Sequence, residues 1–184
     1  MSNGPIRARR GDDWARLKRK ASPAKAGWAG GASSATRPMR AKRAAVGGRC
    51  FIDTNILIYT QASDAPRKQR AALDLLRRLH DSAKGVVSTQ VLTEYANIAI
   101  EKLRLAAPRV REQLSFWEQF EVIQVTPAII HSGLDLHQTR SLSFYDALIV
   151  ATAHAGGCGV LYSEDMHGGE EIDRMRIVNP FAPK

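Results

Sequence analysis

Cysteine is scarce in this sequence of 184 residues, and its scarcity argues against two classes of protein. The two cysteines, Cys50 and Cys158, are far apart and form no CxxC pair, so neither a disulfide-rich domain nor a structural zinc site is expected. Both lie in or beside apolar runs, which favours small buried core residues.

Long apolar runs are also missing. The longest, around 147–153, is far shorter than the roughly 18 residues that indicate a membrane span. The first residues do not show the apolar stretch of a signal peptide. We therefore expect a cytoplasmic protein with no membrane segment.

Net positive charge is lacking in residues 49–184, the part of the chain that has the composition of a folded domain. The net charge is +9, but residues 1–48 hold twelve Lys and Arg against two acids, whereas residues 49–184 hold 15 basic and 16 acidic residues. The overall basicity thus belongs to the N-terminal stretch and says little about what the folded part binds.

Residues 1–48 also lack a periodic apolar pattern, and such a segment buries too little surface to offset its ordering entropy. We predict a disordered tail. It is either a basic arm that binds nucleic acid or an accessory extension of the reading frame, with Met39 as a possible later start. We favour the second interpretation.

The remainder, 49–184, alternates short strands with helices. Apolar runs predict strands over 50–52, 85–87, 122–125, 159–162 and 176–178, and helical spacing predicts helices over 56–61, 66–80, 88–103, 108–120, 127–140 and 143–155. This order is typical of a parallel sheet with helices on both faces. We predict one three-layer α/β/α domain with a short parallel sheet.

Four acids stand where such a sheet would bring them together. Asp53 ends the first strand and Asp165 follows a later one, and sites in these sheets form at the carboxyl ends of strands. Glu94 lies in the helix after a short strand, and Asp146 lies in the first turn of an otherwise apolar helix.

Each acid also has a purely structural interpretation. Asp53 can cap the helix that follows it, and Glu94 can be a solvated helix residue. Asp146 forms Ser-x-x-Asp with Ser143, the pattern of a capping box. Asp165 can be a turn residue. No single acid decides between structure and chemistry.

The joint pattern resembles the signature of PIN-domain ribonucleases, and its order and spacing resemble VapC-type toxins of type II toxin–antitoxin modules. The segments that carry the resemblance are FIDTNILIY at 51–59, STQVLTEY at 88–95, SFYDALIVATA at 143–153, LYSEDM at 161–166 and VNPF at 178–181. The resemblance covers about 49–181 and leaves out the tail.

The resemblance implies a divalent-metal ribonuclease with Asp53, Glu94, Asp146 and Asp165 around the metal, and Asn55 and Ser163 as polar supports. An all-carboxylate cluster agrees, because oxygen ligands suit Mg²⁺ or Mn²⁺ better than zinc. The ion would activate water and stabilise charge on the scissile phosphate. RNA, a cognate antitoxin protein and a second copy of the chain are the partners that the resemblance implies.

Other functions stay open. An aspartate-nucleophile phosphatase or dehalogenase would need Asp-x-Asp here, but Asn55 holds the second position. A non-catalytic RNA- or protein-binding PIN module would be expected to lack one of the acids. A PIN nuclease of RNA maturation would share them all.

A partner groove is a further expectation. Five apolar residues of the helices at 66–80 and 88–103 are candidates for a groove that takes an antitoxin helix: Leu75, Leu76, Leu79, Ile98 and Leu103. The alternative is that they belong to the ordinary core.

Overall fold

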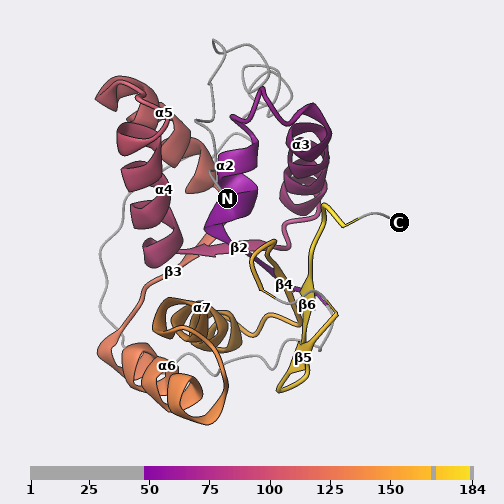
Figure 1. Ribbon diagram of the computed structural model, residues 1–184, viewed down its shortest axis with the longest axis vertical. Coiled ribbons are helices and arrows are strands. Elements are labelled where there is room, and N and C mark those ends of the chain that lie inside the picture. Colours follow the sequence, from indigo (N-terminus) through magenta and orange to yellow (C-terminus); the bar gives the residue numbers. More distant parts are fainter. Residues whose placement is uncertain (1–47, 167–168, 183–184) are drawn as a thin grey trace, which may run out of the picture.

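A computed structural model describes residues 48–166 and 169–182 (Figure 1). The predicted tail, 1–48, lies outside the described residues except for Gly48. The domain boundary at 49 stays a prediction. Arg49 forms an ion pair with Glu121, and the first strand begins at the next residue.

The strands form one sheet in the order β3-β2-β1-β4-β6-β5. They are β1 (Cys50–Ile52), β2 (Gly85–Ser88), β3 (Glu121–Ile123), β4 (Val160–Tyr162), β5 (Glu171–Ile172) and β6 (Met175–Val178). All neighbours pair in parallel except β5, which pairs antiparallel with β6. The prediction of a parallel sheet is confirmed for the strands that it named, and the edge hairpin of β5 and β6 was not predicted because β5 spans two residues.

The helices cover both sides of the sheet, which confirms the three-layer α/β/α prediction. They are α2 (Thr54–Tyr59), α3 (Pro66–Asp81), α4 (Thr89–Glu101), α5 (Ala107–Trp117), α6 (Pro127–Thr139) and α7 (Phe144–Ala155). Figure 1 shows α3, α4 and α5 on one side of the strands and α6 and α7 on the other. None of the described helices is long and apolar enough to cross a membrane.

Side-chain caps fix where several helices start. Ser88, Thr126 and Ser143 each accept a hydrogen bond from a backbone N–H in the first turn of the helix that follows. Each cap satisfies a donor that the helix itself leaves unpaired. The caps therefore define the first residues of α4 and α7, the helices that carry Glu94 and Asp146.

The core lies between the sheet and its helices. Helix α7 is buried over seven consecutive residues, Ala147–Ala153, because α6 covers the side that the sheet does not. Cys158 is buried as expected, and Cys50 is half-buried. The predicted antitoxin groove is wrong for Leu75, Leu76, Leu79 and Leu103, which are all buried in this core.

The chain order creates a crevice at the centre of the sheet. From β1 the chain moves outward through β2 to β3, and it then returns past β1 to place β4 on the other side. Ligands of open α/β sheets bind at such a reversal, outside the carboxyl ends of the strands. The candidate site is therefore expected just beyond Ile52 and Tyr162.

Candidate functional site

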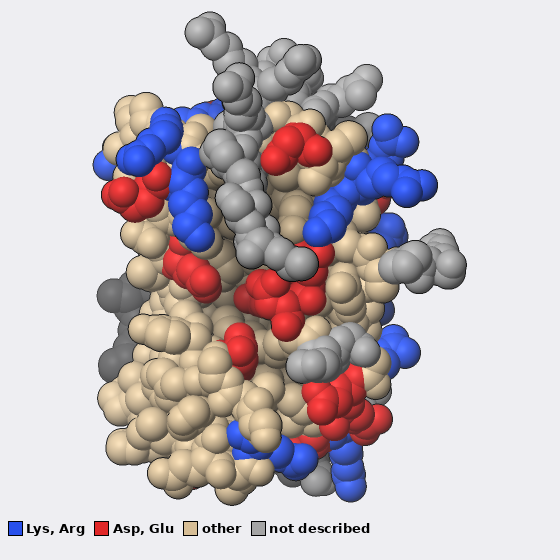
Figure 2. Space-filling view, in the orientation of Figure 1, with Lys and Arg blue, Asp and Glu red and all other residues tan. Residues whose placement is uncertain are grey.

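An acidic cavity opens at this reversal, with a volume of about 230 Å³. All four acids singled out in the sequence line it, from four different segments of the chain: Asp53, Glu94, Asp146 and Asp165. Figure 2 shows Asp and Glu side chains gathered in a hollow at the centre of one face. The expectation that strand and helix ends would bring these acids to one place agrees with the structure.

Asp53 is the most buried of the four, with 9% of its surface exposed. Its Oδ1 accepts a 2.6 Å hydrogen bond from the backbone N–H of Thr54, so it does cap α2. Its Oδ2 accepts from the Ser163 hydroxyl at 2.7 Å and from Nδ2 of Asn55 at 3.0 Å. The same carboxylate thus caps α2 and lines the acidic cavity.

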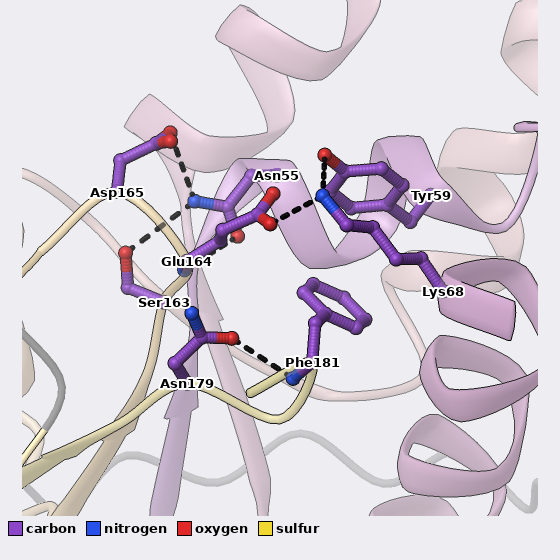
Figure 3. A network of polar contacts seen from close by, with 8 residues as sticks. All are labelled: Asn55, Tyr59, Lys68, Ser163, Glu164, Asp165, Asn179 and Phe181. Atoms are coloured by element: carbon purple, nitrogen blue, oxygen red, sulfur yellow. Dashed lines mark hydrogen bonds and ion pairs between the residues drawn. The ribbon is translucent and has the colours of Figure 1, made fainter. Parts of the chain in front are cut away.

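Asn55 and Ser163, the predicted polar supports, join the two strand ends. Nδ2 of Asn55 lies 3.1 Å from Oδ2 of Asp165, and Oδ1 of Asn55 accepts from the backbone N–H of Glu164 at 3.3 Å. Figure 3 shows this amide between Asp165 and Ser163. The loop after β4 is therefore held against the start of α2.

Glu94 enters the cavity from α4. Its Oε2 accepts a 2.8 Å hydrogen bond from the hydroxyl of Thr54, a residue that sequence reasoning did not single out. Glu94 and Ile98 lie four residues apart on one face of α4, and Lys102, which caps its C-terminus, continues the spacing; all three line the cavity. That spacing is the sequence signal that would have added Lys102 and placed Ile98 at the site instead of in a partner groove.

Asp146 lies at the start of α7 and faces Ser143. The Ser143 hydroxyl donates to its Oδ2 at 2.6 Å, and the backbone N–H of Asp146 lies 3.2 Å from Ser143 Oγ. The predicted capping interaction is therefore present. The residue also lines the acidic cavity, so capping and cavity lining coexist here as they do at Asp53.

The pKa of Asp53 is raised to about 6. Burial is the largest cause, because it disfavours the charged form. Hydrogen bonds from Ser163 and Thr54 oppose the shift, and the nearby charges of Glu94 and Asp165 add to it. Three of the four acids therefore interact electrostatically, and a cation among them would relieve their repulsion.

The donor set fits a hard divalent cation. Carboxylates with hydroxyl and amide neighbours are the oxygen ligands that Mg²⁺ and Mn²⁺ prefer. Within 48–166 and 169–182, no three acidic, histidine or cysteine side chains stand close enough to hold an ion as they are. Glu94, Asp146 and Asp165 are instead hydrogen-bonded to Thr54, Ser143 and Asn55, and rotations about their side-chain bonds would be needed to bring them together.

A second polar network borders the cavity and was missed by sequence reasoning. Lys68 of α3 donates to Oε1 of Glu164 at 2.5 Å and to the Tyr59 hydroxyl at 2.9 Å (Figure 3). The Phe181 ring packs edge-on against Tyr59 with a centroid separation of 4.7 Å. The network ties the loop that carries Asp165 to α3 and to the C-terminal segment.

Several solved structures resemble this chain. Significant sequence matches are absent among curated proteins. Among solved structures, a toxin–antitoxin complex from Klebsiella pneumoniae is similar with a TM-score of 0.55 and 25% identity, over 71% of this chain and 97% of that one. VapBC2 from Rickettsia felis, bound to a DNA fragment from its promoter, reaches a TM-score of 0.52 at 17% identity, over 70% and 96% of the two chains.

The fold is also shared with VapC20 of Mycobacterium tuberculosis, described as a sarcin–ricin loop cleaving toxin. The TM-score is 0.50 at 22% identity, over 63% of this chain and 89% of that one. A model of the PIN domain family matches residues 50–168, which include all four acids and both polar supports. This chain belongs to the PIN domain family.

Proposed function

We propose that this protein is a divalent-metal-dependent ribonuclease and the toxin of a type II toxin–antitoxin module. The observation that carries the proposal is the convergence of Asp53, Glu94, Asp146 and Asp165 on one cavity in a PIN domain. The likeness to a toxin–antitoxin complex of Klebsiella pneumoniae supports the toxin role.

In this proposal the four acids hold Mg²⁺ or Mn²⁺. When bound, the ion would supply a Lewis acid and a water of lowered pKa at the scissile phosphate. The buried carboxylate of Asp53, with its pKa raised to about 6, gains most from a cation, since its charge is the most poorly solvated.

The residues around the acids have positioning roles. Asn55 and Ser163 hold Asp53 and Asp165 through hydrogen bonds, and Thr54 holds Glu94. Partners of this kind fix the orientation of metal-binding carboxylates. Lys102 is the basic side chain among the residues that line the cavity, so it can attract the phosphate backbone of RNA.

The proposed partners are an RNA substrate and an antitoxin protein. A homodimer and a cytoplasmic location were expected from the sequence, and both stay predictions. The antitoxin would bind elsewhere than the four buried leucines that the sequence suggested, because their side chains are already packed in the core.

Replacing each acid by its amide tests the proposal. Asp53→Asn, Glu94→Gln, Asp146→Asn and Asp165→Asn should each abolish cleavage of RNA with Mg²⁺ or Mn²⁺. Glu101→Gln is the matched control, because Glu101 lies on the same helix as Glu94 but pairs with Arg104 and does not line the cavity. Full cleavage by Asp53→Asn or Asp146→Asn would overturn the proposal.

A further inference from the structure

A second hollow adjoins the acidic cavity. Its volume is about 540 Å³, within the roughly 300–1,000 Å³ of small-molecule sites. We call it the side hollow, and it is lined by Thr89, Gln90, Thr93, Glu94, Asn97, Val125 and Tyr145. Gln90, Glu94 and Tyr145 line both spaces, so a ligand can extend from one into the other.

The chemistry of the side hollow differs from that of the acidic cavity. No Lys or Arg lines it, and its one charged residue, Glu94, lies on the shared border. The other lining groups are amides, hydroxyls, one valine and one aromatic ring. With no cation and with a carboxylate on its border, such a surface disfavours a phosphate, but it does suit a flat heterocycle with hydrogen-bonding edges.

Tyr145 supplies the flat surface. It is 70% exposed, although it belongs to α7, in which Ala147–Ala153 are buried. Its backbone is held by Nε2 of Gln90, which donates to the Tyr145 carbonyl at 3.4 Å, and its ring packs against Phe144 with centroids 5.7 Å apart. An exposed apolar side chain is ordinary by itself. Here, however, the backbone is held and the residue lines the acidic cavity next to Asp146, so the ring offers a flat surface at a defined position.

Two amides that line the side hollow have hydrogen-bonding capacity to spare. Oε1 of Gln90 is buried and accepts no hydrogen bond from the described residues. A buried acceptor without a partner costs about 1–3 kcal/mol, which a donor from a ligand would offset. Asn97 lies further along the same helix and its side chain is exposed at the hollow.

We propose that the side hollow binds one unpaired base of a single-stranded RNA segment next to the scissile phosphate, stacked on Tyr145 with its edge toward Gln90 and Asn97. The inference rests on the proposed ribonuclease function and adds a base-binding subsite beside the acidic cavity, with Tyr145 as its stacking surface. Proteins that recognise single-stranded RNA stack bases on aromatic side chains and read their edges with amides. A base in a duplex cannot present its face in this way.

Binding of short, unstructured oligoribonucleotides tests this. The full chain is used with Asp53→Asn in the background and Mg²⁺ present, at a salt concentration that suppresses electrostatic binding by the basic residues 1–48. Adding Tyr145→Ala should weaken binding by about 5- to 150-fold, the loss expected for one stacked base. Tyr145→Phe and Tyr145→Trp should bind as tightly as Tyr145, because stacking needs the ring and not the hydroxyl.

An abasic site placed at successive positions of the RNA identifies the base. At one position the abasic site should weaken RNA binding by the protein that keeps Tyr145 as much as Tyr145→Ala does. At that position it should not weaken RNA binding by the Tyr145→Ala variant any further. Asn97→Ala should change which base is preferred at that position. Leu134→Ala is the control, since Leu134 is an exposed apolar residue of α6 that lines neither space. Thermal melting verifies that each variant is folded.

Equal binding by Tyr145 and Tyr145→Ala overturns the proposal, and so does an abasic effect of the same size in both. The second outcome would mean that the base binds away from Tyr145, and a loss of antitoxin binding alone on Tyr145→Ala would make the ring part of a protein interface. Failure of the ribonuclease function is distinguishable, because it appears as an absence of cleavage by the unaltered protein. Coupling between Tyr145 and one base can be measured with or without cleavage.

Discussion

Asn55 and Asp165 are 110 residues apart in the sequence, yet Nδ2 of Asn55 donates to Oδ2 of Asp165 at 3.1 Å. The same amide nitrogen lies 3.0 Å from Oδ2 of Asp53. One neutral side chain thus stands between two acids and donates to both. It fixes their directions without adding a charge, which a lysine in its place would do.

Asn55→Ala should therefore weaken Mg²⁺ or Mn²⁺ binding by about 10- to 100-fold, the usual effect of losing a residue that orients metal ligands. The fold should survive, because the backbone of α2 is capped by Asp53 and not by Asn55. Isothermal titration with Mn²⁺ measures the affinity. Asn179→Ala is the control, since Asn179 accepts a hydrogen bond from the Phe181 backbone and does not line the acidic cavity. Unchanged affinity in Asn55→Ala would show that the amide does not orient the carboxylates.

Asp53→Asn should change how stability depends on pH. The pKa of Asp53 is about 6 in the folded chain and near 3.8 when unfolded, so the folded state holds more protons between these values. Unfolding then becomes easier as pH rises from about 4 to 6, because the folded protein must ionise a buried acid. Each unit of pKa corresponds to about 1.4 kcal/mol.

The asparagine variant lacks this effect, and its side-chain oxygen can still cap α2. In chelator, the melting temperature of Asp53→Asn relative to the unaltered protein should rise between pH 4 and pH 7. Groups that do not interact with Asp53 titrate alike in both proteins and cancel in the difference, which leaves the titration of Asp53 and of the Glu94 and Asp165 charges coupled to it. A difference that stays constant across this range would mean that Asp53 titrates normally.

The Lys68–Glu164 ion pair should contribute only a small free energy to holding the loop that carries Asp165. Lys68 is 38% exposed and Glu164 21%, so solvent screens the pair, and a coupling of about 0.5–1 kcal/mol is expected. A double-mutant cycle with Lys68→Met and Glu164→Gln in urea unfolding measures it. Lys68 also lies 4.6 Å from the centre of the Tyr59 ring, and Tyr59→Leu should remove that contact and the packing against Phe181. Strict additivity of the two single changes would exclude a role for the pair.

Residues 1–48 should be dispensable for cleavage, because β1 starts at Cys50 and the ion pair of Arg49 with Glu121 lies within the domain. A chain that begins at Arg49 should cleave RNA as fast as the full chain at low salt. A deficit only at higher salt would identify the tail as an electrostatic RNA-binding arm. Loss of cleavage at low and high salt alike would mean that the proposed domain boundary is wrong.

The sequence predicted most of the fold because its signals are local. Helix caps such as Ser88 and Thr126, and the apolar spacing of α3, determine element type within a few residues. Strand β5 gave no such signal, since two residues cannot show a period. Helix α5 ends at Trp117, three residues before the predicted end, and the turn that follows leads directly into β3.

The candidate site was predictable in part for a different reason. Asp53 and Asp165 follow strands, so their meeting follows from the topology. The bond from Thr54 to Glu94 and the contact of Lys68 with Glu164 depend on how α4 and α3 pack, which no local pattern encodes. Four of the five apolar candidates for a groove are core residues instead, because helical spacing cannot distinguish a core face from a binding face.

The most direct test of the metal-dependent ribonuclease is reversible dependence of RNA cleavage on metal. The purified full chain should cleave single-stranded RNA with Mg²⁺ or Mn²⁺, stop when a chelator is added in excess, and resume when Mg²⁺ or Mn²⁺ is restored above the chelator. Asp53→Asn should remain inactive throughout. Cleavage by the unaltered protein that continues undiminished in chelator would contradict the account and leave Asp53, Glu94, Asp146 and Asp165 as structural residues.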